Sequence, residues 1–600
     1  MNLAFADYMR VMRGCFLGKT IGGTLGMPYE GDLGTREVTY YDPVPTSMVP
    51  NDDLDLQVVN LEILRRRGLP VCSHYLAEFW THYMAGFPDE YGVANHNVSR
   101  GLYPPLSGYY SNAFHGGMGA AIRSELWACL APGDPVLAVR LAREDASTDH
   151  ANDGIDASAF LAAIESAAFI EKDRDALLET GFSFIGHNHC MTNAFRDVIR
   201  WWKERRNPKE IRKQILAAYP SQNWTDVTVN LSLILLSWLA SEGDFGRGIC
   251  TAASLGYDAD CTCATLGAIL GMIAPERIEE KWTRPIGREL ALSPCIVGSH
   301  EPETIDEFMN MVAETCVEVQ RYYGSVTKIA GDLPTYGGAS AWTQRHEIVS
   351  CRSADSHHVS LLSVSPLAVR LVYPEGVAVV PGERTAFSLE LGNPLEIDAQ
   401  GWLELIPPEG WMVSPAQLSF NMGPGEEQTF AVDVTAPRYS ICKWRNPLDI
   451  RIHLCGQGIT TTAGLIQAIP YQVQVHGKEI SAWATSNVLP IPEGTTGISL
   501  EFKAARPLTN MRMLAQGTLP LCLRLNGQEI SRHGNEFYLP AFHRNPDSVR
   551  VDLPGGWNRV EIDFPQPASS VGEVFFGVAE YNAWQWINTL EYRLPGGKEG

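Results

Sequence analysis

Apolar residues recur at helical spacing through the first half of the chain. Between residues 8 and 16 they fall three or four positions apart, and residues 56–64 repeat the pattern before a basic turn and Gly68. Residues 227–239 are apolar nearly all round, which predicts a helix buried on every side. The same spacing predicts further helices over residues 157–170, 263–273 and 308–322.

The pattern changes near residue 355. From there, short runs alternate apolar and polar residues between Gly, Pro and Asn, as half-buried strands do. Residues 521–530 predict a hairpin with a turn at Asn526-Gly527. We therefore expect a multidomain chain, and residues 438–469 could belong to either of its two sandwiches. The expected parts are an all-α domain over residues 1–355, an Ig-like β-sandwich over 362–437 and a jelly-roll-like β-sandwich over 438–600.

Charge and composition narrow the partners of the chain. Lys and Arg number 47 against 69 Asp and Glu, a formal net charge of −22, which argues against nucleic acid or an anionic membrane as the main partner. No apolar run reaches the length of about eighteen residues that a membrane span needs, and Asp7 and Arg10 interrupt any signal-like segment. Thirteen cysteines without pair spacing indicate reduced thiols and a cytoplasmic location.

Two acidic clusters, far apart in the chain, each precede an apolar helix. Their members are Asn51, Asp52, Asp53 and Asp55 in the first cluster and Asp258 and Asp260 in the second. Each cluster alone could be a helix cap, because a helix N-terminus favours negative charge. Together they could instead supply the oxygen ligands that hard cations prefer.

A third group of polar residues, His187-Asn188-His189-Cys190, also has ligand types that bind transition metals. Its spacing matches no zinc motif, and no third ligand pair is identifiable, so it does not predict a zinc site.

Five segments, in sequence order, resemble motifs of the ADP-ribosylglycohydrolase family. They are residues 18–30, which end in Pro28-Tyr29-Glu30, then Asn51-Asp52-Asp53, residues 117–123, Thr148-Asp149-His150 and residues 256–261. The resemblance covers roughly residues 8–345. It implies an all-α catalytic domain with a site for magnesium ions between helices.

The resemblance also implies roles for individual residues. The metal ligands would be Asn51, Asp52, Asp53, Asp258 and Asp260. The catalytic residues would be Glu30, close to the scissile bond, and Asp53. The substrate-binding residues would be Gly117, Gly119, His150 and Tyr29. The cofactor would be a divalent metal, with magnesium expected as one or two ions and calcium as the alternative.

The chain departs from the family pattern at several positions. Asn51 stands in place of a threonine, and Cys261 replaces a hydroxyl residue with a soft ligand that suits magnesium poorly. Gly23 replaces the usual aspartate of the opening helix. Met118 and Ala120 remove polar groups where ADP-ribose would be held. These departures predict a changed substrate.

We therefore expect a glycosyl hydrolase that cleaves an N- or O-linked glycosidic bond at C1 of a ribose-like or related sugar, with metal assistance. Its partner would be a small glycoside or an ADP-ribose-like substrate. Two alternatives stay open: an ADP-ribosyl-protein or ADP-ribosyl small-molecule hydrolase, and a non-catalytic binding protein of the same fold. A homo-oligomer is also left open, and the β domains could bind carbohydrate or mediate packing.

Overall fold

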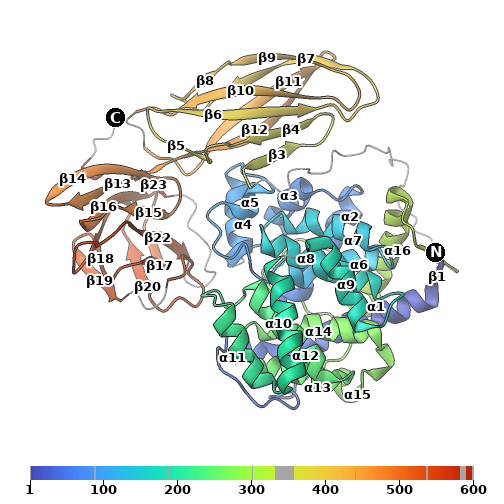
Figure 1. Ribbon diagram of the computed structural model, residues 1–600. Helices are drawn as coiled ribbons and strands as arrows, with labels where there is room; N and C mark the ends of the chain where they lie inside the picture. The colour runs from blue at the N-terminus through green and yellow to red at the C-terminus, as the bar shows by residue number, and fades with distance from the viewer. Residues whose placement is uncertain are drawn as a thin grey trace. The chain divides into compact units, whose positions relative to one another are not determined.

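The computed structural model describes residues 2–86, 89–186, 189–299, 302–331, 357–438, 441–534, 538–580 and 590–596. The chain divides into two compact units, the first made of Met1–Ala85 and Phe114–Arg345, the second of Gly86–Ala113 and His346–Gly600 (Figure 1). Helices dominate the first unit and strands the second, as the sequence predicts. In the described ranges, no helix combines the length and apolarity needed to cross a membrane.

Among its described residues, the first unit consists of helices and one short parallel pair of strands, β1 (Asn2–Ala4) and β2 (Lys328–Ala330). The first half of the unit contains α1 (Phe5–Gly26), η1 (Met27–Tyr29), α2 (Asp52–Arg67), α3 (Ser73–Tyr83), η2 (Ala121–Arg123), α6 (Ser124–Leu130), α7 (Pro135–Ala146) and α8 (Asp153–Ala167). The second half contains α9 (Arg174–Ile185), α10 (Cys190–Arg205), α11 (Pro208–Ala218), α12 (Val227–Ser241), α13 (Phe245–Leu255), α14 (Ala259–Ile273), η3 (Pro275–Arg277), α15 (Glu280–Thr283) and α16 (Ile305–Tyr323). The helices predicted from apolar spacing correspond to α1, α2, α8, α12, α14 and α16, although the one predicted over residues 157–170 already ends at Ala167.

Helices α1 and α14 pack backbone against backbone. The glycines of α1 that face α14 recur every fourth residue, at Gly14, Gly18, Gly22 and Gly26. A Cβ atom at any of them would lie between 2.0 and 2.2 Å from a carbonyl oxygen of α14. Only glycine fits at such a distance. Since Gly26 contacts Ala259, this packing brings the end of α1 beside the start of α14, where the second acidic cluster lies.

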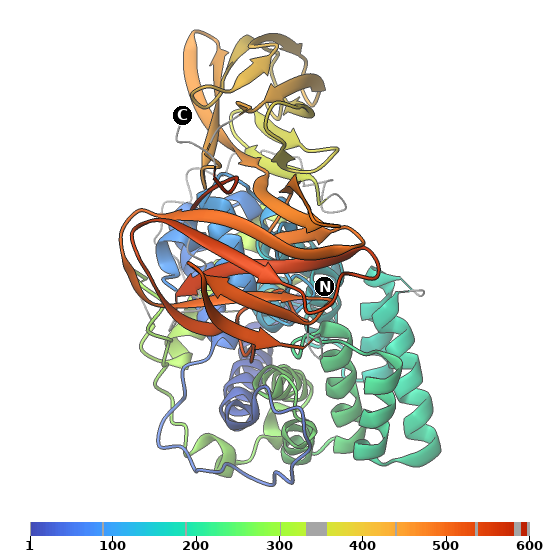
Figure 2. The ribbon, with the colours of Figure 1, turned by 90° about the vertical axis from the view of Figure 1, so that its left-hand side faces the viewer.

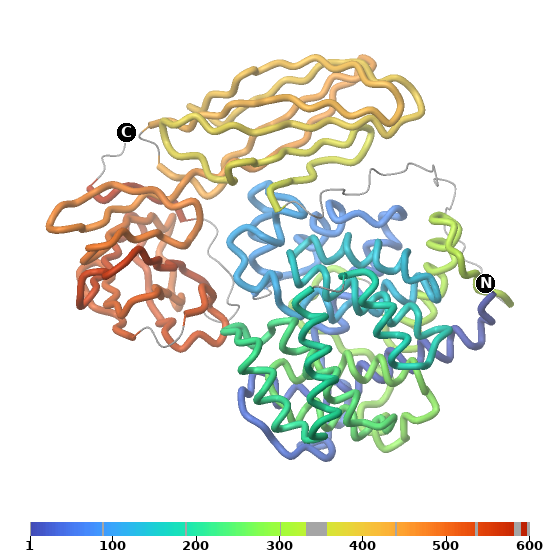
Figure 3. The backbone as a smooth tube through the Cα atoms, viewed as in Figure 1, coloured from blue at the N-terminus to red at the C-terminus, as the bar shows by residue number. Residues whose placement is uncertain are grey.

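Residues 86–113 belong to the second unit, although the sequence prediction includes them in an all-α domain of residues 1–355. The segment forms α4 (Asp89–Ser99) and α5 (Leu106–Tyr109), drawn in light blue in Figure 3. Leu102 and Leu106 lie in the hydrophobic core of the first sandwich. The Leu361 amide also donates a hydrogen bond to the Pro104 carbonyl at 3.0 Å.

The first sandwich packs two sheets around one core. In the described residues the sheets have the strand orders β3-β4-β6-β10-β8 and β5-β12-β11-β7-β9. The strands are β3 (Val359–Ser363), β4 (Ala368–Val372), β5 (Ala378–Val379), β6 (Arg384–Gly392), β7 (Ala399–Ile406), β8 (Met412–Ser414), β9 (Gln417–Met422), β10 (Glu427–Thr435), β11 (Asn446–Leu454) and β12 (Gln457–Gln467). Because β11 pairs with β7 and β12 with β5, this sandwich runs to Gln467 and not to the expected limit at 437.

The second sandwich follows directly and is seen in orange and red in Figure 2. Its sheets have the orders β14-β13-β16-β21-β18-β19, with β23 also pairing with β16, and β15-β22-β17-β20 among the described residues. The strands are β13 (Ile469–Val475), β14 (Lys478–Ala484), β15 (Val488–Ile491), β16 (Thr495–Ala504), β17 (Leu508–Gly517), β18 (Leu521–Leu525), β19 (Gln528–His533), β20 (Val549–Leu553), β21 (Gly556–Asp563), β22 (Gly572–Glu580) and β23 (Glu591–Arg593). The predicted hairpin is confirmed, since β18 pairs with β19 and both turn residues, Asn526 and Gly527, have positive φ.

Candidate metal centre

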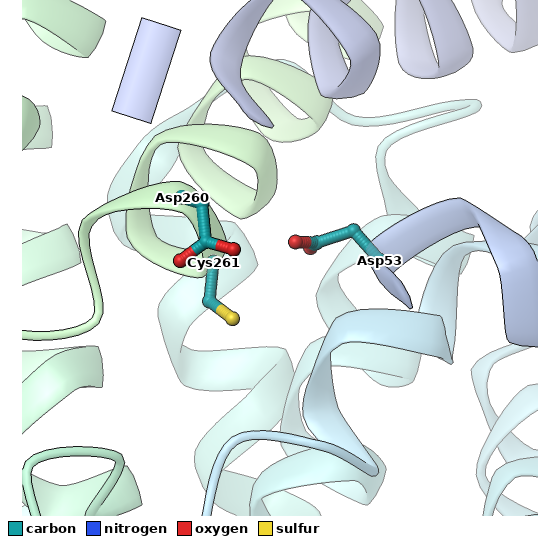
Figure 4. A group of neighbouring side chains, drawn as sticks. All are labelled: Asp53, Asp260 and Cys261. Carbon is teal, nitrogen blue, oxygen red and sulfur yellow. The ribbon is translucent and has the colours of Figure 1, made fainter. Parts of the chain in front are cut away.

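Two helix N-termini bring the acidic clusters together in the first unit. Asp53 lies in the first turn of α2, and Asp260 and Cys261 lie in the first turn of α14. Figure 4 shows the carboxylates of Asp53 and Asp260 facing one another, with the Cys261 thiol beside them. One ligand atom from each of the three residues lies within 4.8 Å of the other two, and all three residues are buried. This is a cation-sized arrangement of donors.

Two oxygens in this group need a partner. Asp53 Oδ2 and Asp260 Oδ1 are buried and accept no hydrogen bond within the described chain. The other Asp53 oxygen, Oδ1, accepts a hydrogen bond from Lys19 Nζ at 3.0 Å. Buried carboxylate oxygens without a partner are costly. A divalent cation between Asp53 and Asp260 would satisfy both, so these residues fit the metal that the resemblance implies.

The electrostatics of the acids point the same way. Burial, and then the charges of neighbouring acids, raise the pKa of Asp52 and of Asp260 well above their usual value. Burial also raises the pKa of Asp258 to about 8. The Glu30 carboxylate adds to all three shifts, which places Glu30 among these acids. Repulsion among like charges is relieved by protons or by a cation.

The loop that carries Glu30 is pinned to the loop before α14. The Gly31 amide donates to the Tyr257 carbonyl at 2.7 Å, and the Tyr257 amide donates to the Asp32 carbonyl at 2.8 Å. Tyr257 has a φ of +65°, and its neighbour Asp258 donates its amide to Asn230 Oδ1 at 3.3 Å. These bonds fix the half-buried Glu30 close to the second cluster.

Lys19 and Glu125 hold Asp53 in place beside the centre. Neither residue was predicted from the sequence. Lys19 is only 1% exposed and donates to Asp53 Oδ1 at 3.0 Å and to Glu125 Oε1 at 2.8 Å. Gln57 Nε2 donates to the second Glu125 oxygen at 2.9 Å. Burial raises the pKa of Glu125 to about 7, although Lys19 opposes the shift. The sequence did contain one indication of this pair. Lys19 is a single lysine among glycines and apolar residues, and a lysine is buried in such a helix only when it has a partner.

Asn51 caps a helix beside the centre. Its Oδ1 accepts the Asp53 amide at 2.8 Å, which makes it the N-cap of α2. Its Nδ2 faces Asp260 Oδ2 at 3.5 Å, and a Cβ at Gly23 would lie 2.9 Å from that nitrogen. One lone pair of the carbonyl oxygen is thus used by the cap and the N–H group faces Asp260, and the role of Asn51 as an oxygen ligand stays a prediction.

The remaining acids of the first cluster differ in position. Asp52 is half-buried at the start of α2. Asp55 is fully buried and accepts the Ser293 amide at 3.1 and 3.3 Å, so its carboxylate holds the 293 loop.

The predicted substrate residues around Gly117 are mostly engaged in internal bonds. The Gly117 amide donates to the Phe114 carbonyl at 2.7 Å, which removes it from a phosphate cradle. The Gly119 carbonyl accepts from Arg123 at 2.7 Å. His150 is 0% exposed; its Nε2 accepts the Ala120 amide at 3.2 Å and its Nδ1 lies 2.9 Å from Asp149 Oδ1. His150 therefore supports this segment from inside.

Arg123 is the centre of a fully buried network behind the same segment. Its Nη2 donates to Asp149 Oδ1 at 2.6 Å and its Nε to Asp145 Oδ2 at 2.7 Å. Trp127 and Asn60 donate further hydrogen bonds to Asp145. Each acid in this network thus has a cation of the chain as its partner.

Two further residues singled out from the sequence are Tyr29, a predicted substrate-binding residue, and His189, from the group that predicts no zinc site. Tyr29 is half-buried, and burial followed by the nearby Asp42 charge raises its pKa, so its role in substrate binding stays a prediction. His189 Nε2 lies 3.3 Å from Asp153 and 3.2 Å from Asp156, and these carboxylates raise its pKa to about 9. His189 is therefore an ion-pair partner. Its neighbours in the motif, residues 187 and 188, lie outside the described residues.

A family model and several solved structures match this chain. A family model described as ADP-ribosylglycohydrolase matches residues 6–318. A solved structure described as "ADP-ribosylglycohydrolase-related protein complex" is 18% identical with a TM-score of 0.36, over 53% of this chain and 99% of that one. Two α-L-rhamnosidase structures, from Aspergillus terreus and Dictyoglumus thermophilum, are 11% and 8% identical with TM-scores of 0.14 and 0.16. They cover 38% and 39% of this chain and 28% and 29% of their own.

No curated protein matches the sequence. The family match nevertheless spans more than half of the 600 residues and includes both acidic clusters. Members of this family are glycosyl hydrolases that typically depend on a divalent metal. The chain belongs to the ADP-ribosylglycohydrolase family.

Proposed function

We propose that the chain hydrolyses an N- or O-linked glycosidic bond at C1 of a ribose-like or related sugar, with a divalent cation held between α2 and α14. The observation that carries this proposal is the pair of facing, unpartnered oxygens on Asp53 and Asp260. The cation would orient sugar hydroxyls and polarise water. Magnesium is the expected ion. The nearby Cys261 thiol would also allow softer divalent ions to bind in its place.

The residues divide the work between holding the cation and moving a proton. Asp53 has one oxygen bound to Lys19, so only Oδ2 is open, which suits a ligand better than a general base. Asp260 is the second ligand, and Asp258 and Asp52 surround it. Glu30 lies at the half-buried edge of the acids and is the residue we assign to proton transfer at the glycosidic bond.

The segment next to the centre supports a substrate other than a protein-linked ADP-ribose. Met118 and Ala120, which stand where the family has polar residues, are 1% and 0% exposed. The Ala120 amide is held by His150, and the Gly117 amide by Phe114. Fewer groups are thus left to bind a diphosphate, which favours a smaller glycoside.

The proposal is tested by measuring bound metal and turnover on the full chain. The protein is dialysed with magnesium, manganese or calcium, its metal content is determined, and nitrophenyl glycosides of pentoses are assayed beside ADP-ribosyl substrates. We expect bound cation, cation-dependent release of nitrophenol, and a loss of about 100-fold or more in kcat for Glu30→Gln. Asp260→Asn should lose the cation as well as the activity.

The matched control is Glu37→Gln, which removes the same charge from an exposed position in the same unit. It should keep full activity. Turnover restricted to ADP-ribosyl substrates would replace our substrate class. Absence of turnover on every substrate, or equal rates for the Glu30 and Glu37 variants, would overturn the proposal in favour of a binding protein.

A further inference from the structure

The second compact unit contains a cavity that the hydrolase site does not involve. It has a volume of about 60 Å³ and lies where α4, the 442–444 segment and strands of both sandwiches meet. By the space that one buried water occupies, it holds on the order of five waters, enough for one small charged group. The residues of its lining used below are His96, Arg100, Tyr110, Lys443, Trp444 and Tyr592.

The cavity carries positive charge without an acid to balance it. Arg100 contacts the Tyr110 ring, with 5.4 Å from its guanidinium carbon to the ring centroid, and donates from Nη2 to the neutral Asn97 side chain at 2.6 Å. Its Nε is buried and has no hydrogen-bond partner in the described chain. Lys443 adds a second positive charge, and the described lining contains no Asp or Glu.

His96 lies in the same lining, which has positive charge but no acid among its described residues. Its Nδ1 is also buried and without a hydrogen-bond partner in the described residues. Burial, and then the charge of Arg100, hold the pKa of His96 well below its usual value, so the ring is neutral and keeps one N–H to donate. The C-terminus of α4, which Arg100 follows, offers only part of a negative charge. Arg100 is half-buried and Lys443 is exposed, and a partly desolvated cation without an acid in the lining favours an anion from solution.

The walls of the cavity are fixed by the backbone. A Cβ at Gly464 would lie 2.2 Å from the Arg100 carbonyl, and the Gly464 amide donates to Gly101 at 2.9 Å. Cys442 and Tyr592 exchange two backbone hydrogen bonds, of 2.8 and 3.0 Å. The site is therefore formed before any ligand arrives, which reduces the entropic cost of binding.

We propose that this cavity binds a small oxyanion, the carboxylate or phosphate group of a compact ligand. Arg100, Lys443 and the neutral His96 ring line it and bring the positive charge and N–H groups that an oxyanion needs, and the Trp444 ring lies in the same lining. The proposal concerns the second unit and does not rest on the metal centre or on hydrolysis.

Binding to the full chain is measured by calorimetry with inorganic phosphate, with sodium D-glucuronate and with D-glucose as the neutral probe. We expect saturable binding of at least one anion and a loss in affinity of about tenfold or more in Arg100→Gln. The matched control is Arg506→Gln, which removes an exposed arginine of the same unit and should bind like the parent chain. Phosphate binding alone identifies a phosphate site, and glucuronate binding alone a carboxylate site.

A second variant keeps the test decisive if Arg100→Gln does not fold. Arg100→Lys retains the charge but loses the planar fork, and it should bind the anion more weakly than the parent chain. The proposal is overturned if neither anion binds, if glucose binds as well as glucuronate, or if Arg506→Gln and the Arg100 variants lose affinity equally.

Discussion

The helical unit buries two groups of acids, and their charges are balanced in opposite ways. In the arginine network, burial would raise the pKa of Asp149, but Arg123 and His150 outweigh it, and the pKa is lowered. Burial still raises the pKa of its neighbour Asp145, against the charge of Arg123. In the candidate metal centre, burial and neighbouring acids raise the pKa of Asp260 well above its usual value. Asp149 and Asp260 are both buried, 0% and 3% exposed, so exposure does not explain the difference between them.

The difference lies in where the compensating positive charge comes from. The network contains its own cation, Arg123, which bonds both of its acids. The centre has Lys19 for one oxygen of Asp53, while four acids surround the rest of the space. A protein that buries acids without a cation of its own is suited to receive one from solution. The predictions below test this contrast, beginning with the largest effect.

Arg123→Met should destabilise the helical unit most. The variant leaves Asp145 and Asp149 buried without a cation, and breaking a buried pair in this way costs about 3–5 kcal/mol. Urea denaturation followed by tryptophan fluorescence measures the loss. Arg143→Met, at a half-buried arginine that pairs with Asp156, is the control and should cost about 1 kcal/mol or less. Equal losses in the two variants would contradict the role of the network.

Lys19→Met should cost less, about 2–4 kcal/mol, because Glu125 can take up a proton when its partner is lost. The loss should shrink when a divalent cation is added, since the freed Asp53 oxygen can then bind the ion. Lys281→Met, at an exposed lysine, is the control in the same denaturation series. A cation that leaves the Lys19 variant as unstable as before would separate Lys19 from the centre.

Lys19 and Glu125 also show the limit of prediction from sequence. Asn51-Asp52-Asp53 and Asp258-Ala259-Asp260 were found because helix caps and apolar stripes are local patterns. The bond between Lys19 and Glu125 joins residues 106 positions apart, so no local pattern reports it. The fit of Lys19 depends on the glycine-mediated approach of α1 to α14, which brings its helix against the centre.

The same reason explains the domain limits. Residues 89–99 form α4, which the predicted all-α domain over residues 1–355 groups with the other helices. Its packing with the strands depends on Leu102 and on bonds to residues more than 250 positions later in the chain. Likewise, Asn446–Leu454 alternates as a strand of either sandwich would, and only its pairing with β7 assigns it to the first.

The stability of the metal-free protein should fall as the pH rises from about 5 to 8. The pKa of Glu125 is raised to about 7 and that of Asp258 to about 8, so in this window the folded state holds protons that the unfolded state has released. The unfolded state then binds fewer protons, and stability decreases with pH by up to about 1.4 kcal/mol per pH unit for each group. Over this window the two groups allow a fall of at most roughly 7 kcal/mol, measured by denaturation at several pH values.

A saturating divalent cation should flatten this pH dependence, because the ion replaces the protons among the acids. Lowering the pH would then weaken cation binding. A metal-free protein whose stability rises between pH 5 and 8 would show that the acids of the centre are ionised and balanced within the chain, like those of the network.

Asp260→Asn should stabilise the metal-free protein by about 1 kcal/mol at pH 8, since it removes one buried like charge. The same substitution in the network, Asp149→Asn, should destabilise it, because Arg123 loses an anionic partner. Opposite signs for one chemical change would be the clearest expression of the contrast. A loss of stability in both variants would mean that Asp260 is already paired.

The smallest effect concerns the kind of ion. Cys261 brings a thiol within reach of the ligand oxygens of Asp53 and Asp260, and burial raises its pKa well above the usual value, so without a cation it remains a neutral thiol. A divalent cation lowers the pKa of a thiol that binds it, and softer ions profit more from this donor. Cys261→Ser should therefore shift the preference from manganese toward magnesium by a few fold, on the order of 0.5–1 kcal/mol, in competition titrations. Cys263→Ser, two residues along α14 in the α1 packing, keeps the parent preference if the thiol of Cys261 is the one that faces the cation. An unchanged preference in the Cys261 variant would mean that the thiol does not bind the cation and that only the two carboxylates do.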